Sequence, residues 1–246
     1  MGFMKKALFI FFWLCVMSGQ AYSAPLSIAC AANFTSAMKE LTTVYTEETG
    51  SKADCTYGST GMLFGQITNG APYDLFFAAD EKRPALLHEQ GLALKPIGYA
   101  RGTVVLWSKN ASLSYFKDWK AAACNGAIKT VGIASPKTAP YGARANEAMV
   151  KAKIYEKIQP KLVFGKSVGV SFQYAYSGAA DVAFVALSQA LSDKGKAGVH
   201  WAIPEASLVD QDVCVITRGD TEAALTFLKW LETSHAQSII KRYGYE

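Results

Sequence analysis

The chain has 246 residues, of which 50% are hydrophobic and 18% charged, a composition typical of a globular protein with a sizeable core. This composition excludes fibrous and intrinsically disordered proteins. The net charge of +5 is mild and the basic residues are scattered along the chain, so neither nucleic acid nor an acidic membrane surface is expected as a partner.

The first 24 residues have the three regions of a secretory signal peptide. Lys5 and Lys6 precede an apolar run over residues 7–16, and small residues follow near 21–24. A membrane anchor is the less favoured alternative, because the run is shorter than the roughly 20 apolar residues of a spanning helix. Cys15 lacks the small residues that precede a lipoprotein cysteine. Cleavage removes both lysines and leaves a net charge of +3, and we expect a free periplasmic protein.

Two predicted strands each run into a short polar loop that opens an amphipathic helix, over residues 26–41 and 55–67. The first loop reads AANFT at 31–35, and the second reads GSTG at 58–61. Backbone N–H groups are unpaired at a helix N-terminus and lie at the positive end of the helix dipole. Such loops therefore predict an anion site that needs no Lys or Arg.

The segment NGAPYDLFFAAD at 69–80 is an apolar strand between a Gly/Pro turn and a capping Asp80. Read together with the two loops, it resembles the molybdate-binding periplasmic proteins of ABC transporters. In that family a G-A-P-x-D-L-F-x-x-A-D run follows a loop and helix of this kind. The likeness extends from about Leu26 to the KRYG sequence at 241–244.

From residue 103 to about 216, a second set of strands and helices repeats the style of the first. The predicted strands lie at 103–107, 130–134, 161–164 and 180–186, the predicted helices at 141–158 and 167–176, and a closing helix starts near Thr221. This alternation favours the α/β class, with parallel sheets covered on both faces.

The resemblance implies a two-lobed periplasmic binding protein of type II, in which each lobe is a mixed, mostly parallel sheet flanked by helices. We expect lobe 1 to comprise 25–102 plus 217–246 and lobe 2 to comprise 103–216, joined by two crossover strands. The ligand would then lie between the lobes, at the carboxyl ends of the strands.

The chemistry of the loops restricts the anion. A fully deprotonated tetrahedral dianion such as molybdate, tungstate or sulfate offers only acceptors, so its site should consist of donors. A carboxylate would suit hydrogen phosphate, by accepting its proton, and would repel the other anions. Neither loop contains Asp or Glu. An unprotonated oxyanion is therefore favoured.

In the first lobe the resemblance assigns oxyanion contacts to the Asn33 amide and to the hydroxyls of Ser59 and Thr60. Asn33 has an alternative role as a simple helix N-cap, since Asn is among the best capping residues. The alternative for Ser59 and Thr60 is a capping pair in a turn bounded by glycines.

In the second lobe the resemblance assigns backbone N–H donors to Tyr141 and Val168. Pro140 has no N–H to give, and the Tyr141 phenol is either a further donor or a packing group. Some family members place a Tyr hydroxyl where this chain has Ala186, and Asn33, Ser188 or Tyr141 would have to replace it. Molybdenum would be held through the oxygens of molybdate, without direct protein ligands. Lys166 either attracts anions at long range or is an ordinary solvated lysine.

Four cysteines remain after cleavage, in an oxidising compartment. We prefer pairing of Cys30 with Cys55 and of Cys124 with Cys214, because the first two occupy similar positions in adjoining strands. Free buried thiols are the alternative. A metal site is less favoured, because no Cys-x-x-Cys spacing occurs.

An enzyme is the rival class, but the sequence carries no complete set of catalytic residues. His88, His200 and His235 are isolated, and no phosphate-binding Gly-Lys-Thr loop occurs. We therefore expect a monomeric, cofactor-free receptor that captures molybdate, and also tungstate, for an inner-membrane ABC permease. The alternative is a receptor of the same fold for sulfate, phosphate or a small organic anion, for which Arg144 is the nearest candidate clamp.

Overall fold

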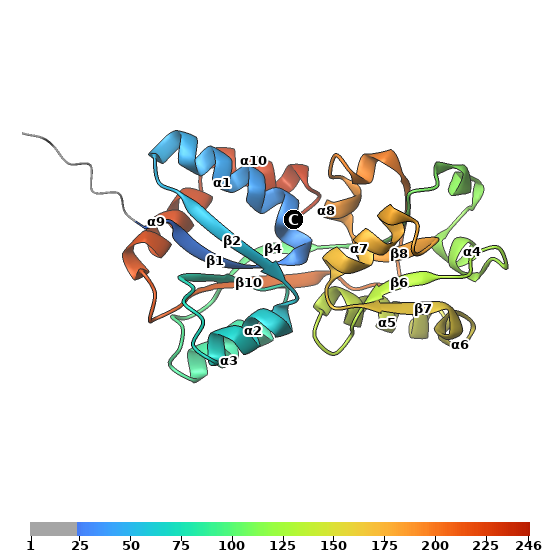
Figure 1. Ribbon diagram of the computed structural model, residues 1–246, viewed down its shortest axis with the longest axis horizontal. Coiled ribbons are helices and arrows are strands. Elements are labelled where there is room, and N and C mark those ends of the chain that lie inside the picture. Colours follow the sequence, from blue (N-terminus) through green and yellow to red (C-terminus); the bar gives the residue numbers. More distant parts are fainter. Residues whose placement is uncertain (1–23) are drawn as a thin grey trace, which may run out of the picture.

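The computed structural model describes residues 24–246, which form two lobes side by side (Figure 1). The expected signal peptide lies outside the described residues, apart from Ala24. Over residues 24–246 no helix is long and apolar enough to cross a membrane.

The first lobe is built on a five-stranded sheet with the order β2-β1-β3-β10-β4. Its strands are β1 (Leu26–Ala31), β2 (Ala53–Gly58), β3 (Leu75–Phe77), β4 (Ile97–Gly102) and β10 (Val209–Val215). β1 pairs in parallel with β2 and β3, whereas β10 runs antiparallel to β3 and β4. β1 and β3 are almost wholly apolar and buried, as expected of strands covered on both faces.

The second sheet has the order β7-β6-β8-β5-β9 and the same arrangement of parallel and antiparallel pairs. Its strands are β5 (Val104–Ser108), β6 (Val131–Ala134), β7 (Leu162–Gly165), β8 (Val182–Ala186) and β9 (Val199–Ala202). The expected two-lobed α/β fold with mixed sheets is confirmed. Each sheet has two parallel and two antiparallel pairings, so the parallel strands are less dominant than the alternating pattern indicated.

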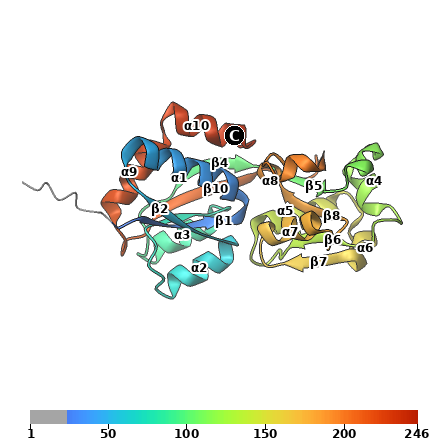
Figure 2. The same ribbon diagram turned by 45° about the horizontal axis from the view of Figure 1, so that its top comes forward.

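Helices cover both faces of the first sheet (Figure 2). They are η1 (Ala32–Phe34), α1 (Thr35–Thr49), α2 (Thr60–Thr68), α3 (Lys82–Glu89), α9 (Thr221–Leu231) and α10 (Ser234–Arg242). One face packs against α1, α9 and α10. The core between them contains Phe34, Phe77 and Phe227, which are fully buried. The other face packs against α2 and α3. Complete burial of each large apolar side chain contributes about 1.5 to 3 kcal/mol to folding.

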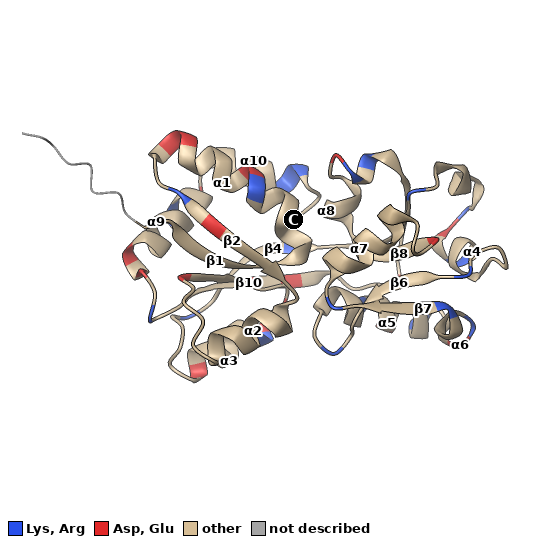
Figure 3. Ribbon diagram, viewed as in Figure 1, with Lys and Arg blue, Asp and Glu red and all other residues tan. Residues whose placement is uncertain are grey.

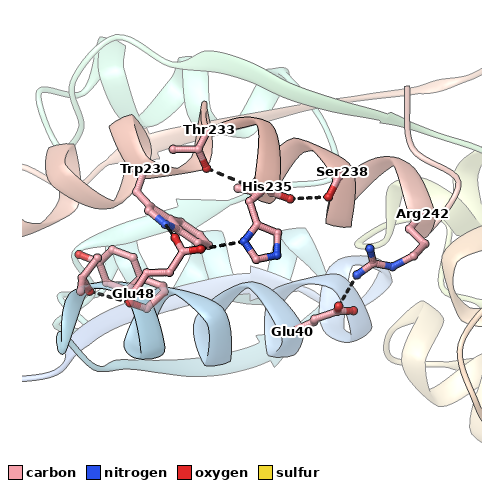
Figure 4. Close-up of polar contacts among 10 residues, drawn as sticks. Glu40, Glu48, Trp230, Thr233, His235, Ser238 and Arg242 are labelled. Atoms are coloured by element: carbon pink, nitrogen blue, oxygen red, sulfur yellow. Dashed lines mark hydrogen bonds and ion pairs between the residues drawn. The ribbon is translucent and has the colours of Figure 1, made fainter.

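Polar contacts between helices close the outer side of this lobe. The carboxylate of Glu48, near the end of α1, accepts from the Trp230 indole at 2.6 Å and lies 2.7 Å from Nδ1 of His235 (Figure 4). Glu40 and Arg242 form a second ion pair between α1 and α10.

The helices of the second lobe also cover both faces of their sheet. They are η2 (Ala111–Tyr115), α4 (Trp119–Cys124), α5 (Pro140–Lys151), α6 (Tyr155–Ile158), η3 (Gln159–Lys161), α7 (Val168–Ser177), α8 (Leu187–Ala190) and η4 (Gly195–Ala197). The single helix predicted at 141–158 is wrong, because the chain breaks it at Lys153, whose φ of 56° is left-handed. The interruption separates α5 from α6.

Lobe 2 was expected to end at residue 216, and the strand pairing places its end earlier in the chain. β10 hydrogen-bonds to β3 and β4 within the first sheet, so the chain returns to the first lobe between Ala202 and Val209. The sequence of β10, VDQDVCV, does not indicate which sheet the strand joins, and only its pairing shows this.

The preferred disulfide pairing is wrong, because all four cysteines are free thiols in the structure. Cys30 lies opposite Tyr57 rather than Cys55, so the two cysteines are offset by two residues across the strand pair. Diagonal neighbours of this kind lie about 7 to 8 Å apart, beyond the usual Cα separation of a disulfide of about 4.4 to 6.8 Å. Cys124 packs in the second lobe, whereas Cys214 packs in the first.

Charged residues are distributed over both lobes (Figure 3). Residues of both signs occur on each lobe, and the basic residues do not gather into one stripe. Many charges pair locally, as Arg144 does with Glu147 at 2.9 Å and Lys120 with Glu205 at 2.9 Å.

Candidate functional site

Two parallel strands of each sheet end where the lobes meet, and a helix begins directly after each. β1 leads into η1 and α1, and β2 into α2, while β6 and β7 lead into the loops that open α5 and α7. The carboxyl ends of neighbouring parallel strands lie at the same edge of a sheet. The positive ends of four helical segments therefore face the boundary between the lobes.

A small cavity lies at this boundary, with lining residues from both lobes. Its walls are Ala31, Ala32, Asn33, Gly58, Ser59, Thr60 and Ala79 of the first lobe and Ala139, Pro140, Tyr141 and Val168 of the second. All five residues predicted to contact the anion line this one cavity. Asn33 and Thr60 are 1% exposed, so these two side chains are shielded from bulk solvent in the structure.

The two hydroxyls from α2 are held by backbone bonds that they accept. Ser59 is the N-cap of α2, and its Oγ accepts from the Met62 N–H at 3.3 Å. Thr60 Oγ1 accepts from the Ala79 N–H at 3.0 Å, at the end of β3. A hydroxyl has one hydrogen to donate, and neither hydroxyl donates it to a protein acceptor among the described residues. Both hydrogens are therefore available to a ligand, although Ser59 also has the capping role considered as its alternative.

The second lobe contributes backbone donors. Tyr141 is the second residue of α5 after Pro140, and Val168 is the first residue of α7, which Ser167 caps through its hydroxyl. First-turn N–H groups have no carbonyl four residues earlier to bond within the helix. Both N–H groups come from helix starts at the cavity wall, where an oxyanion would be stabilised.

Asn33 lies in η1 and makes no capping bond, so the capping alternative is not what the structure contains. Its Nδ2 donates to Gln211 Oε1 at 2.6 Å and to the Tyr245 hydroxyl at 3.1 Å, and lies 3.5 Å from the Tyr141 hydroxyl. Its backbone carbonyl accepts from the hydroxyls of Ser188 at 2.7 Å and Tyr245 at 2.9 Å. The orientation of the amide is thus set by residues far away in the sequence.

These contacts join three parts of the chain. Gln211 lies on β10 and is 1% exposed, Tyr245 is three residues beyond α10, and Ser188 and Tyr141 belong to the second lobe. Burial raises the pKa of Tyr141 well above its ordinary value of 10, and burial likewise raises the pKa of Tyr245. Both phenols therefore stay protonated at neutral pH and remain hydrogen-bond donors.

The cavity wall is electrically neutral. None of its lining residues is Lys, Arg, His, Asp or Glu. Between residues 24 and 246 no three His, Cys, Asp or Glu side chains group as metal ligands would. A wall of hydroxyls, an amide and helix N-termini suits a ligand that offers only acceptors, and direct coordination of a cation has no basis in these residues.

Other residues singled out in the sequence lie outside this cavity. Lys166 is exposed. Arg144 pairs with Glu147 and lines a neighbouring cavity, which shares Ala79, Ala139 and Pro140 with this one. Ala186 ends β8, and the hydroxyl of nearby Ser188 donates to the Asn33 carbonyl rather than lining the cavity. Of the three proposed replacements for the absent Tyr donor, Asn33 and Tyr141 are at the wall.

The sequence did not predict the two residues that accept hydrogen bonds from the Asn33 amide, Gln211 and Tyr245. Gln211 and Tyr245 carry no local motif, and their part in the site depends on β10 and the C-terminus reaching the boundary between the lobes. The sequence carries no local signal, because Gln211 lies between Asp210 and Asp212 in β10, where a polar side chain does not stand out.

Comparison with known proteins gives consistent matches over nearly all the described chain. Residues 26–246 match the family described as bacterial extracellular solute-binding protein. The molybdate-binding protein ModA of Rhodobacter capsulatus is 40% identical over 222 residues, covering 88% of this chain and 86% of the relative. That of Azotobacter vinelandii is 38% identical over 231 residues, covering 92% and 91%.

A solved structure gives the same result. The periplasmic molybdate-binding protein of Azotobacter vinelandii superposes with a TM-score of 0.85 at 33% identity, covering 90% of this chain and 98% of that structure. The similarity therefore includes both lobes and the boundary between them.

Proposed function

The chain belongs to the ModA family of bacterial extracellular solute-binding proteins, and we propose that it captures molybdate between its lobes and delivers it to an ABC permease. The expected periplasmic location follows from the same family membership. Capture would be reversible, because every contact is a hydrogen bond to an oxygen of the anion.

One observation carries the proposal: the described cavity between the lobes is walled by neutral donors from both lobes. We assign the contacts to Asn33, the Ser59 and Thr60 hydroxyls, and the Tyr141 and Val168 backbone N–H groups, all of which belong to the wall. Both hydrogens of Asn33 Nδ2 are directed at Gln211 and Tyr245, so a bond from this amide to the anion would replace one of these two. Preorganised donors in a site closed to water stabilise a dianion without a counter-charge. The absence of a carboxylate at the wall disfavours anions that carry a proton.

Both lobes are needed to complete this set of donors. A ligand that contacts donors of both lobes stabilises the arrangement in which they meet and shifts the population towards it. The distance between the lobes would then report occupancy to the permease. We extend the proposal to tungstate, which presents the same tetrahedron of acceptors, and to a monomer that works without a cofactor and without catalysis.

Calorimetric titration of the ligand-stripped protein with molybdate, and separately with sulfate and phosphate, tests the proposal. Tight one-to-one binding of molybdate, with sulfate and phosphate silent, is the expected result. Silence towards all three anions would discard the oxyanion receptor, and equal affinity for sulfate would replace it with a less selective one.

Small organic anions are the remaining alternative ligands. A variant at Arg144 distinguishes a receptor for them from a receptor for molybdate. An organic acid is usually held by an Arg clamp, whereas Arg144 pairs with Glu147 and does not line the cavity. The substitution Arg144→Ala should leave molybdate affinity unchanged. Loss of binding in this variant would favour an Arg-dependent ligand.

A further inference from the structure

The start of α2 makes a direct backbone contact with the other lobe. The N–H of Gly61 donates to the carbonyl of Thr138 at 2.9 Å, in the loop that precedes α5. Next to it, Nη2 of Arg83 lies 3.4 Å from the carbonyl of Lys137. Figure 1 shows the start of α2 turned towards the second lobe at this point.

The first turn of α2 has few N–H groups to give. The first four N–H groups of a helix have no partner within it, and in α2 the Met62 N–H is taken by Ser59 Oγ. The Gly61 N–H is bonded to Thr138 of the second lobe, although it directly follows the proposed anion contacts Ser59 and Thr60. This donor therefore serves contact between the lobes and not the anion.

The contact also leaves little room for a side chain at position 61. A Cβ placed on Gly61 would lie 3.0 Å from the Thr138 carbonyl oxygen, 3.1 Å from Thr138 Cα and 3.1 Å from Arg83 Nη2. Two of these neighbours are backbone atoms, which cannot rotate away, so the Thr138 loop has to move back from α2 by a few tenths of an ångström, which lengthens the contact between the lobes. Gly61 lies in a helix at an ordinary φ, and a larger residue would therefore be tolerated if the second lobe were distant.

We propose that Gly61 and Thr138 form the closing contact of the two lobes, and that the absence of a side chain at position 61 determines how tightly the anion is held. Gly61 is a positioning residue: it does not touch the ligand, and it acts by allowing the closed arrangement to form. This inference rests on the proposed function, because it requires an anion that is bound between closing lobes.

The decisive comparison is between Gly61→Ala and Gly65→Ala in the same helix. A Cβ placed on Gly65 would meet no atom within 4 Å, so this position is a matched control for the change in helix propensity. Overpacking at a closed contact reduces the fraction of competent protein, and we expect Gly61→Ala to weaken molybdate binding about tenfold. Gly61→Val should weaken it further, and Gly65→Ala should leave it unchanged.

Kinetics and stability separate the closing role from a general structural one. Since the contact forms after the anion has entered, stopped-flow measurements should find faster release with little change in the association rate. The melting temperature of the ligand-free protein should not fall, because Ala is the better helix former. A fall in that temperature matching the loss of affinity would overturn the proposal, since the contact would then stabilise the ligand-free fold.

The outcomes also distinguish this inference from the function on which it rests. Wild-type protein that does not bind molybdate would overturn both. Tight binding by wild type together with unchanged affinity and release rate in Gly61→Ala and Gly61→Val would overturn the closing contact alone.

Discussion

At the scale of single residues, the site uses groups that have no charge of their own. Ser59 and Thr60 each accept a backbone bond, which fixes the oxygen and leaves the hydroxyl hydrogen for the cavity. This arrangement avoids the cost of burying a Lys or Arg when the site is empty. It also explains why a search of the sequence for basic residues gives no indication of the anion.

Replacing Ser59 with Ala should reduce molybdate affinity by about 10 to 100-fold, the value of one lost hydrogen bond to a charged group. The substitution also removes an N-cap, which costs about 1 kcal/mol of stability. Thr233→Ala is the control, because the Thr233 hydroxyl caps α10 in the same way and is not part of the cavity wall. Calorimetry should detect weaker binding only in the Ser59 variant, and equal affinities in both would remove Ser59 from the ligand contacts.

Gln211 supports the Asn33 amide from β10, and Gln211→Leu keeps its approximate size while removing its polar atoms. The variant leaves Asn33 Nδ2 and the Tyr99 hydroxyl without the oxygen that they share. We expect the free energy of unfolding to fall by about 1 to 3 kcal/mol, measured by urea denaturation. Gln66→Leu, which loses a single bond to the partly buried Tyr73 hydroxyl, should cost less. Equal losses would contradict a special role for the buried contacts of Gln211.

At the scale of elements, the sequence predicted the strands and helices that open the site, because there local and tertiary preferences agree. α1 and α2 each follow a strand and begin at a polar loop, and the starts of both helices were predicted to within a few residues. The break at Lys153 was missed because a left-handed Lys leaves no compositional signal where Gly would. β4 was not predicted as a separate strand, because its sequence, IGYARG, is only weakly apolar. In the structure this strand is partly exposed.

The contact of α1 with α9 and α10 should make part of the stability depend on pH (Figure 4). Hydrogen bonds from Trp230, and then from His235, hold the pKa of Glu48 below its ordinary value of 4.5. Because the folded pKa is lowered, the stabilisation is complete above the unfolded pKa and disappears as the pH falls through the folded pKa. Glu48→Gln should therefore melt at a lower temperature than wild type at pH 7, and the difference should disappear once the pH is below the folded pKa of Glu48.

Glu47 provides the control for this measurement, as an exposed carboxylate beside Glu48 on the same helix. Glu47→Gln should leave the melting temperature close to that of wild type at both pH values. A difference between Glu48→Gln and wild type that persists unchanged into acid would mean that loss of packing, and not of the carboxylate charge, causes it.

At the scale of the whole molecule, two sheets of the same topology bring four strand ends to one boundary. The five residues placed by family resemblance all line the cavity at this boundary, since each lies in a loop or helix start between a strand and the helix that follows it. What could not be predicted depends on distance along the chain. Asn33 is bonded to Gln211 and Tyr245, 178 and 212 residues away, and no local pattern encodes such a pairing. The return of β10 to the first sheet was missed for the same reason.

The neutral wall makes a prediction for the protein as a whole: molybdate affinity should be nearly constant from pH ~6 to ~9. Tyr141 is the only ionisable side chain at the wall of the described cavity, and burial raises its pKa well above 10, so it keeps its proton over this range. The scattered charges outside the site act through water, where salt screens them within about 10 Å at 0.1 M. Calorimetric titrations at constant ionic strength in buffers across this range test the point.

Lys166→Gln, which removes an exposed cation next to α7, should change the association rate at low salt and leave the pH profile flat. A monotonic fall in affinity with rising pH would instead reveal a titrating donor in the shell, and the assignment of the site to neutral groups would have to be abandoned.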